Sequence, residues 1–384
     1  MRVLIVVQRF GEEIVGGSEG HARIVARRLA RRHRVEIATT TAADYWTWAP
    51  SYPAGTTSVD GLVVHRFPVE AGRDPRFKER EAAVFAPGHT LREEQDWLRV
   101  QGPHVPALYD FLHRSGRDHD AIVFYTYIYA PTALGLPLVP ERAVLISTAH
   151  DELPLGLAPY RMLFQLPRAI GYLTPEERAL VHRRFHNEQI PDVVLGIGLD
   201  PPLIGDAAAL RSRLGIAGPL VAYLGQVTAG KGVDELVADW VRYRDAGGPG
   251  TLVLAGNVGL ELPARPDLRV LGRISETEKA DLLAAADVLV HPSHLESLGI
   301  VLLEAWQVGT PVLVPAWNAV TAGQVARSGG GRTYATHDGF GEALRALLAE
   351  GPERGRAGQA WVRAECAWDR FDARLEELLE LAHA

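Results

Sequence analysis

The sequence contains a single cysteine, Cys366, so the chain cannot form an internal disulfide. One thiol in 384 residues suits a reducing compartment. The sequence also lacks any run of about 18 apolar residues, the length that spans a bilayer as a helix. The first two residues lead directly into the apolar stretch 3–7, without the length and cleavage site of a secretory signal peptide. These absences predict a soluble, cytoplasmic protein.

Basic residues are outnumbered by acidic ones, 40 to 47, which gives a formal net charge of −7. Domains that bind nucleic acid are usually basic, so no nucleic-acid partner is expected. Hydrophobic residues make up 47% and charged residues 23% of the chain, as in an ordinary globular protein. Since 384 residues exceed what one hydrophobic core usually organises, two domains are expected.

The stretch 291–311, HPSHLESLGIVLLEAWQVGTP, is the most informative part of the sequence. The apolar run before it, 288–290, reads as a strand that ends at His291, because a proline follows. Apolar residues at helical spacing begin near Gly299, and a glycine and a proline at 309 and 311 predict the end of that helix. A glycine-containing turn into a helix leaves backbone N–H groups free to bind an anion. Glu296 lies just before this turn, and Glu304 lies inside the helix.

The two glutamates allow three interpretations. Glutamate on an exposed helix face usually does nothing but remain hydrated. A hydrolase holds its two carboxylates about 5–9.5 Å apart, whereas the rise of a continuous helix between positions 296 and 304 is roughly 12 Å. A carboxylate also accepts two hydrogen bonds from a vicinal diol. Hydroxyl recognition is favoured, because Glu304 has apolar neighbours in sequence and an idle charge there is costly to desolvate.

Glu296, Glu304 and the segment 305–311 resemble the donor-binding motif of the family 4 retaining glycosyltransferases. The resemblance implies that Glu296 and the backbone of the following loop meet the transferred sugar, and that Glu304 binds the ribose. The loop residues concerned are Ser297, Leu298, Gly299 and Ile300. The family pattern is Glu-Gly-Phe-Gly, so this chain departs from it at positions 297 and 298.

A second motif of that family lies between a predicted strand, 220–224, and a predicted helix, 233–243. Position 232 is glycine where a P-loop requires serine or threonine, so the P-loop motif is excluded. The family pattern is arginine, a few residues, then Lys-Gly, and both cations hold the donor diphosphate. Lys231 matches the lysine, whereas Gln226 replaces the arginine. The resemblance places the nucleotide base at Arg273 and Ile274, after the predicted strand 268–272.

Gly16 and Gly17 end the loop that follows the first predicted strand, and a helical pattern continues to about residue 32. The dinucleotide fingerprint Gly-x-Gly-x-x-Gly is absent from this turn, which disfavours an NAD-dependent oxidoreductase. In the family that the chain resembles, a glycine-rich loop at this position approaches the donor diphosphate and sugar. The alternative is a plain helix with Ser18 as its N-cap.

His150 directly follows the predicted strand 144–147, at the carboxyl end where open α/β sheets bind ligands. A lone histidine is more often structural than catalytic, but the resemblance implies that His150 meets hydroxyl groups of the donor sugar. His182 and His186 have the spacing of a helical zinc pair. Arg183 stands where a metalloprotease has its glutamate, and no third ligand is evident, so no metal is expected.

Arg23, Arg27, Arg31 and Arg34 recur at near-helical spacing after the first turn. The simpler interpretation is a solvated helix face. The sharper interpretation is a peripheral contact with the inner membrane face or with an anionic lipid-linked acceptor, as in some members of the family.

The resemblance, carried by motifs that occur in the family's order, implies the GT-B architecture, two doubly wound α/β domains with parallel sheets that face a cleft. The expected acceptor-side domain is 1–198, the nucleotide-sugar domain is 199–365, and a last helix, about 366–384, packs back on the first domain.

The reaction implied by the resemblance moves a sugar from a nucleoside diphosphate sugar to a hydroxyl of a sugar, glycolipid or small-molecule acceptor. It proceeds with retention, without metal and without a cofactor besides the donor, with His150, Lys231 and Glu296 as the catalytic residues. Lys231 and helix N-termini would stabilise the leaving diphosphate. An epimerase or phosphorylase of the same fold remains an alternative. A nucleotide-sugar-binding protein without turnover is another, suggested by Gln226.

Overall fold

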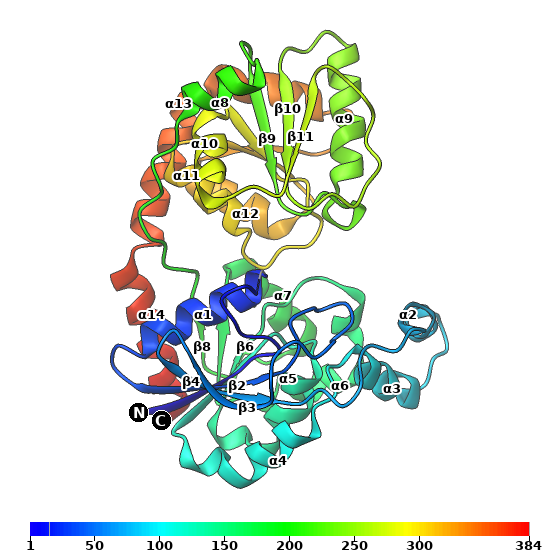
Figure 1. The fold of residues 1–384 in the computed structure, drawn as a ribbon, viewed down its shortest axis with the longest axis vertical. Coiled ribbons are helices and arrows are strands. Elements are labelled where there is room, and N and C mark those ends of the chain that lie inside the picture. The colour runs from blue at the N-terminus through cyan, green and yellow to red at the C-terminus, as the bar shows by residue number, and fades with distance from the viewer. Residues whose placement is uncertain (15, 384) are drawn as a thin grey trace. The chain divides into compact units, whose positions relative to one another are not determined.

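The computed structural model describes residues 1–14 and 16–383 (Figure 1). The predicted first loop includes Val15 and the predicted last helix ends at Ala384, and these two residues lie outside the described ones. The chain forms two compact units. Unit 1 contains Met1–Ile197 and the segment that begins at Asp369, and unit 2 contains Gly198–Trp368.

Unit 1 is built on one sheet, whose strands are β1 (Arg2–Val6), β2 (Arg34–Thr40), β3 (Gly55–Val59), β4 (Leu62–Phe67), β5 (Ala121–Tyr125), β6 (Ala143–Ile146), β7 (Ala169–Tyr172) and β8 (Asp192–Val194). They lie in the order β3-β4-β2-β1-β5-β6-β7-β8 and run parallel except for the β3–β4 hairpin. The helices are α1 (Gly17–Leu29), α2 (Phe77–Phe85), α3 (Leu91–Gln101), α4 (Pro106–Ser115), α5 (Ala130–Gly135), α6 (Ala158–Leu163), α7 (Pro175–Phe185) and α14 (Trp368–His383).

Unit 2 has a parallel sheet of β9 (Leu220–Leu224), β10 (Thr251–Ala255), β11 (Leu268–Gly272), β12 (Val288–Val290), β13 (Val312–Pro315) and β14 (Gly331–Tyr334). Its helices are α8 (Ala207–Leu214), α9 (Val233–Asp245), α10 (Glu276–Ala285), α11 (Ile300–Gln307), α12 (Ala319–Ser328) and α13 (Phe340–Glu365). Figure 1 shows α9 on one side of the sheet and α8 and α10 on the other.

The strand order of unit 2, β11-β10-β9-β12-β13-β14, is that of the doubly wound nucleotide-binding fold. The chain direction across the sheet reverses between β9 and β12, so the carboxyl ends of these two strands border the position where such sheets bind ligands. The two central strands, β9 and β12, are continuous apolar runs that are buried at every position. Such runs are required where helices cover both faces of a parallel sheet. The prediction of two doubly wound parallel-sheet units is therefore confirmed.

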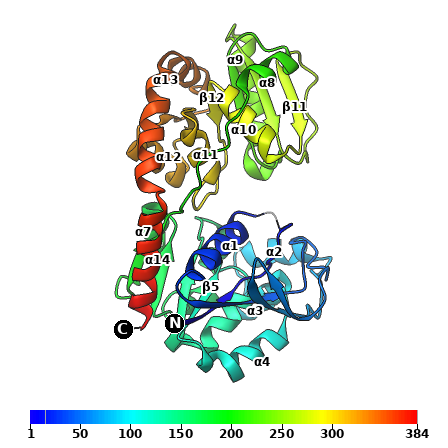
Figure 2. The same cartoon turned by 60° about the vertical axis from the view of Figure 1, so that its left-hand side comes forward.

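The C-terminal helix α14 belongs to unit 1 (Figure 2). It buries Phe371, Leu375 and Leu378. Arg28 of α1 donates a hydrogen bond from Nε to Asp372 at 2.8 Å, which ties the first helix of the unit to the last.

The prediction that the four arginines lie along one face of a single helix is wrong. Helix α1 ends at Leu29, the backbone N–H of His33 closes the following turn on Leu29, and Arg34 starts β2. Arg23 is engaged by both carboxylate oxygens of Asp60, at 2.6 and 3.0 Å. Arg27 is exposed, so the membrane contact stays a prediction that now depends on Arg27 and Arg31.

In the part of the chain that the structure describes, none of the helices combines the length and the apolar character needed to cross a bilayer.

Candidate functional site

Two loops at the carboxyl edge of the unit 2 sheet form the candidate site. One follows β9 and contains Lys231, at the end of a short 3₁₀ turn (η5, Ala229–Lys231). The other follows β12 and contains Glu296. Gly232 has a φ of +70°, and a Cβ added there would lie 2.7 Å from the carbonyl oxygen of Pro292. Glycine is required at 232 both for this backbone conformation and for the close approach of the two loops.

Lys231 and Glu296 form an ion pair across these loops, with 2.8 Å between Nζ and Oε1. His291 hydrogen-bonds the same carboxylate oxygen through Nε2 at 3.1 Å. The lysine side chain is 38% exposed, but the glutamate is only 15% exposed. A ligand can therefore reach the ammonium group, while the carboxylate is held by two neighbours.

Burial by itself would raise the pKa of Glu296. The hydrogen bond from His291 and the charges of His291 and Lys231 outweigh burial and hold this pKa well below its usual range. Glu296 is therefore a stable anion at neutral pH. It can accept hydrogen bonds from sugar hydroxyls, but it is too weak a base to remove a proton efficiently.

Both loops lead into helices, and the first N–H group of α9, that of Val233, donates to the carbonyl oxygen of Thr228 at 3.3 Å. Gly232 is the N-cap of α9, and Gly299, with φ and ψ of 65° and 56°, is the N-cap of α11. Within the described residues neither helix receives a side-chain capping hydrogen bond. The dipoles of two helices thus point positive ends toward the edge that carries Lys231.

The loop after β12 is held in place by α12. Asn318, the N-cap of α12, donates a hydrogen bond to the carbonyl oxygen of Ser293 at 2.8 Å. Gln324 donates to the carbonyl oxygen of Leu298 at 2.5 Å. Sequence reasoning did not identify these two amides, because nothing in their local pattern separates them from ordinary helix residues.

Glu304 lies on α11 and pairs with Lys279 of α10, at 2.8 Å between Oε1 and Nζ. The second partner of Lys279 is Glu276, at 2.7 Å. Burial alone would lower the pKa of Lys279, but the charges of the two glutamates raise it. The contact of Glu304 with the ribose therefore stays a prediction. Glu304 is about 26% exposed and already has a cationic partner, which sequence reasoning missed.

The remaining predicted donor residues of unit 2 lie at the same carboxyl edge. Gln226 is exposed after β9, and its carbonyl oxygen accepts a hydrogen bond from the Tyr223 hydroxyl at 2.8 Å. Arg273 and Ile274 follow β11 directly and precede Ser275, which caps α10. Ser297 and Ile300 are partly exposed beside Glu296, whereas Leu298 and Gly299 are buried.

In unit 1, Gly16 is the N-cap of α1, so the interpretation of Ser18 as the cap is wrong. A Cβ at Gly16 would lie 2.2 Å from Oε2 of Glu19, so the glycine leaves room for that carboxylate. Glu19 is buried and accepts hydrogen bonds from Arg9 and Gln8, each at 2.9 Å. This polar cluster, which the sequence did not reveal, holds the loop in which Gly16 lies.

His150 follows β6, is 29% exposed, and has its Nδ1 3.5 Å from Glu152. Just before it, Thr148 has a φ of 48°, and Thr126 after β5 has a φ of 63°. These values are rare for β-branched residues, and such strain gathers at functional sites. The two threonines are hydrogen-bonded to each other at 3.1 Å through their hydroxyl groups.

Glu177 of α7 supports the His150 loop. Its buried carboxylate accepts hydrogen bonds from the Ser147 hydroxyl at 2.6 Å and from the N–H groups of Ala149 and Leu173 at 2.7 and 2.6 Å. Burial raises the pKa of Glu177, whereas these hydrogen bonds favour its ionised form. One side chain thus connects the ends of β6 and β7 and fixes the backbone next to His150.

The two histidines considered as a zinc pair have other roles. His182 contacts Asp192, with 3.2 Å between Nε2 and Oδ2, while His186 is the exposed C-cap of α7. Among the described residues, no group of three or more histidine, cysteine, aspartate or glutamate side chains is arranged to hold a metal ion.

Residues 210–361 match the family model described as glycosyl transferases group 1, and this segment contains Lys231, Glu296 and Glu304. Over this segment the chain is similar to group 1 glycosyltransferases. The chain is 28% identical, over 396 aligned residues, to the D-inositol 3-phosphate glycosyltransferase of Mycobacterium avium (strain 104). That alignment covers 95% of this chain and 88% of the relative. The protein of the same name from Mycobacterium leprae (strain TN) is 30% identical over 242 residues, which are 57% of this chain and 55% of the relative.

Solved structures share the fold of this chain along nearly its whole length. Sucrose-phosphate synthase from Thermosynechococcus elongatus superimposes with a TM-score of 0.72 at 17% identity, covering 99% of this chain and 98% of that one. Anabaena Alr3699/HepE, solved in complex with UDP, gives 0.69 at 15% identity, covering 99% of this chain and 100% of that one. At such identities the likeness establishes the two-unit GT-B fold alone.

Proposed function

We propose that the chain transfers a sugar, with retention of anomeric configuration, from a nucleoside diphosphate sugar to an acceptor hydroxyl, without a metal ion. The observation that carries this proposal is the contact between Lys231 and Glu296 at the reversal point of the unit 2 sheet. This contact brings one accessible cation and one permanent anion to the N-termini of two helices that have no side-chain caps. These are the groups needed for a diphosphate and for sugar hydroxyls.

The chain's residues take distinct roles in this reaction. Lys231 and the N-terminus of α9 hold the diphosphate and stabilise the charge that grows on it as the bond to the sugar breaks. Glu296 and the backbone of the loop from Ser297 to Ile300 orient the sugar. Glu304 accepts hydrogen bonds from the ribose, and the backbone near Arg273 and Ile274 holds the base. The new bond forms on the face that the diphosphate leaves, and the departing phosphate takes the acceptor proton.

Unit 1 contributes His150 and the loop that contains Gly16 and Gly17, to which we assign the sugar hydroxyls and the donor phosphates. The nature of the donor is supported by similar folds solved with UDP, UDP-glucose or ADP. The name shared by the curated relatives makes D-inositol 3-phosphate the first acceptor to test.

The experiment is a thermal-shift screen of nucleoside diphosphate sugars, followed by transfer assays with the donor that binds. A donor at 100 times its Kd stabilises the folded protein by about 2.7 kcal/mol. Product NMR in EDTA then reports both the anomeric configuration and the need for metal. Inversion, or loss of transfer in EDTA, would contradict the proposed mechanism. Donor binding with neither transfer nor hydrolysis would favour the binding protein that Gln226 suggests.

A further inference from the structure

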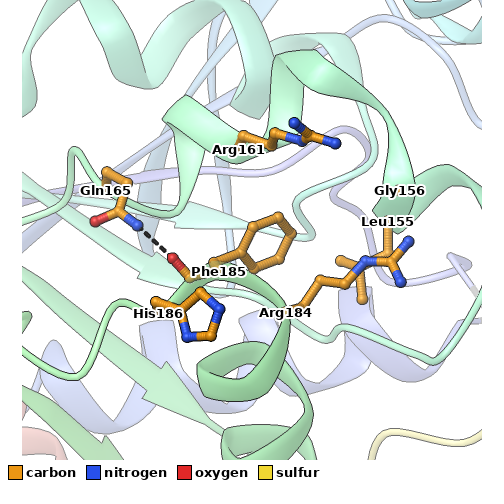
Figure 3. A pocket seen from close by; sticks show the side chains of 7 residues that line it. All are labelled: Leu155, Gly156, Arg161, Gln165, Arg184, Phe185 and His186. Carbon is orange, nitrogen blue, oxygen red and sulfur yellow. Dashed lines mark hydrogen bonds between the residues drawn. The ribbon is translucent and has the colours of Figure 1, made fainter.

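A cavity of about 310 Å³ opens in unit 1, between α6, α7 and the 3₁₀ turn η4 (Leu153–Gly156) (Figure 3). Its apolar part is formed by Leu155 and Phe185, which are 1% and 8% exposed. Phe185 is fixed by stacking on Phe164, with ring centroids 4.5 Å apart and an interplanar angle of 14°. One wall of the cavity is therefore apolar, and its aromatic ring is held in position by stacking.

Two arginines supply the charge of this cavity. Arg161 comes from α6 and Arg184 from α7, and Figure 3 shows them with the Phe185 ring between them in that view. Considering the residues that the structure describes, neither guanidinium forms a hydrogen bond or an ion pair, and no carboxylate lines the cavity. Both arginines are exposed, so each guanidinium group can be reached by an anion from solution.

The neighbouring residues fix the walls. A Cβ at Gly156 would lie 2.6 Å from Nη2 of Arg184, so the guanidinium occupies the space that the glycine leaves. On the other side, Gln165 donates a hydrogen bond to the carbonyl oxygen of Phe185 at 2.7 Å and accepts one from Gln189 at 2.7 Å. The amide is therefore engaged in holding the wall, and the arginines remain as free donors.

We propose that this cavity binds the phosphate group of a small phosphate monoester. Planar guanidinium groups match the oxygens of phosphate with paired, charge-assisted hydrogen bonds. The volume lies at the lower limit for ligand pockets, which suits a phosphate with a small carbon skeleton on the apolar wall. The site lies wholly within unit 1, so it does not depend on the donor chemistry assigned to unit 2. The phosphate belongs to a soluble sugar or polyol phosphate, or to the headgroup of an anionic lipid.

The test is calorimetric titration of the full chain at low salt, with inorganic phosphate and with D-inositol 3-phosphate. Arg161→Gln combined with Arg184→Gln should weaken binding by roughly tenfold or more, the scale of losing one hydrogen bond to a charged group. The matched control combines Arg168→Gln with Arg183→Gln, two nearby arginines that do not line the cavity, and should bind like the wild type. Failure of the donor screen would leave this result intact, so the two proposals fail separately.

A second variant tests the geometry rather than the charge. Gly156→Ala should displace Arg184 and weaken phosphate binding, whereas Gly218→Ala, with open space around its added methyl group, should not. Vesicles of phosphatidylcholine with and without phosphatidic acid separate the sources of the phosphate. Binding of D-inositol 3-phosphate assigns a soluble ligand, and binding of the acidic vesicles alone assigns a lipid. The proposal is overturned if neither probe binds, or if the double variant and its control bind equally well.

Discussion

Lys231 and Glu296 are joined by a 2.8 Å ion pair although 65 positions separate them in the chain. The contact exists because β9 and β12 are neighbours in the sheet, so the loops that follow them leave the same edge. A diphosphate that binds the ammonium group of Lys231 does so while that group is also paired with Glu296, and this ion pair already exists without the ligand. The lysine is thereby held in place before the ligand arrives, which is the preorganisation that stabilises a leaving group.

Replacing Lys231 by alanine should lower kcat by about 10²–10³, the scale for removing a preorganised donor, while the donor KM changes less. The pKa of Glu296 should rise, because one of the charges that lower it is lost. Lys231→Arg should restore transfer only in part, because a planar fork does not replace a compact ammonium. Steady-state transfer measures both variants, and Arg213→Ala, an exposed cation on α8, is the control. A fall in kcat below about fivefold would place leaving-group stabilisation elsewhere.

Glu304→Gln should weaken the binding of a nucleoside diphosphate by about 1–3 kcal/mol, because a charged hydrogen-bond acceptor is lost. Glu276→Gln is the matched control. It removes the other carboxylate from Lys279, but Glu276 is 77% exposed and has no place at the ribose. Binding is measured by calorimetry with a ribose nucleotide and its 2′-deoxy counterpart. The deoxy penalty should be large in the wild type and nearly absent in Glu304→Gln. Equal penalties in both proteins would exclude the ribose contact.

Much of unit 2 was predictable from local patterns. The bounds of β9, β11 and β12 agree with the predicted ranges, because each is a mainly apolar run that turn residues interrupt sharply. The same local signals identified the two loops of the site. By contrast, β14 escaped detection because it begins in a run of glycines and contains Arg332.

The partners of the site residues were not predictable in the same way. Lys279 lies on a different helix from Glu304, and Asn318 and Gln324 reach back to a loop about one helix and one strand earlier. Such contacts depend on the order of strands and on helix packing, which a single sequence does not encode in any short pattern. The positive φ values of Thr126 and Thr148 could not be predicted from the sequence either, because threonine rarely adopts a positive φ.

His21 provides a prediction on stability and pH. It is buried in α1, with Nδ1 3.1 Å from the Tyr125 hydroxyl and Nε2 2.9 Å from the carbonyl oxygen of Gly196. Burial lowers the pKa of His21 to about 4 in the folded protein, against the backbone hydrogen bond that raises it. Between about pH 6.5 and pH 4 the unfolded chain therefore binds a proton that the folded chain does not. The stability linked to His21 is fully present above pH 6.5 and should be lost as the pH falls toward 4.

Urea denaturation over this pH range measures the effect, whose limiting slope is about 1.4 kcal/mol per pH unit for one proton. His21→Gln should be less stable at neutral pH but should lose less stability on acidification than the wild type. His113→Gln, a change of an exposed histidine on α4, is the control and should follow the wild type. If His21→Gln and the wild type lose stability in parallel, the buried histidine does not cause the acid sensitivity.

Gly232 and Gly215 form a matched pair for the contact between the two site loops. Both glycines have positive φ values, +70° and +66°, but only at Gly232 would an added Cβ strike a neighbour, the carbonyl oxygen of Pro292 at 2.7 Å. Alanine at either position should cost about 1–2 kcal/mol for the left-handed backbone. Gly232→Ala should cost more, because the loops must also separate, and it should weaken nucleoside diphosphate binding at least about tenfold, the scale of one lost charge-assisted contact. Gly215→Ala should bind normally. Denaturation measures the free energy of unfolding of both variants, and calorimetry measures their affinity for a nucleoside diphosphate. If both variants lose the same stability and the same affinity, the close approach of Gly232 to Pro292 does not hold Lys231 in its binding position.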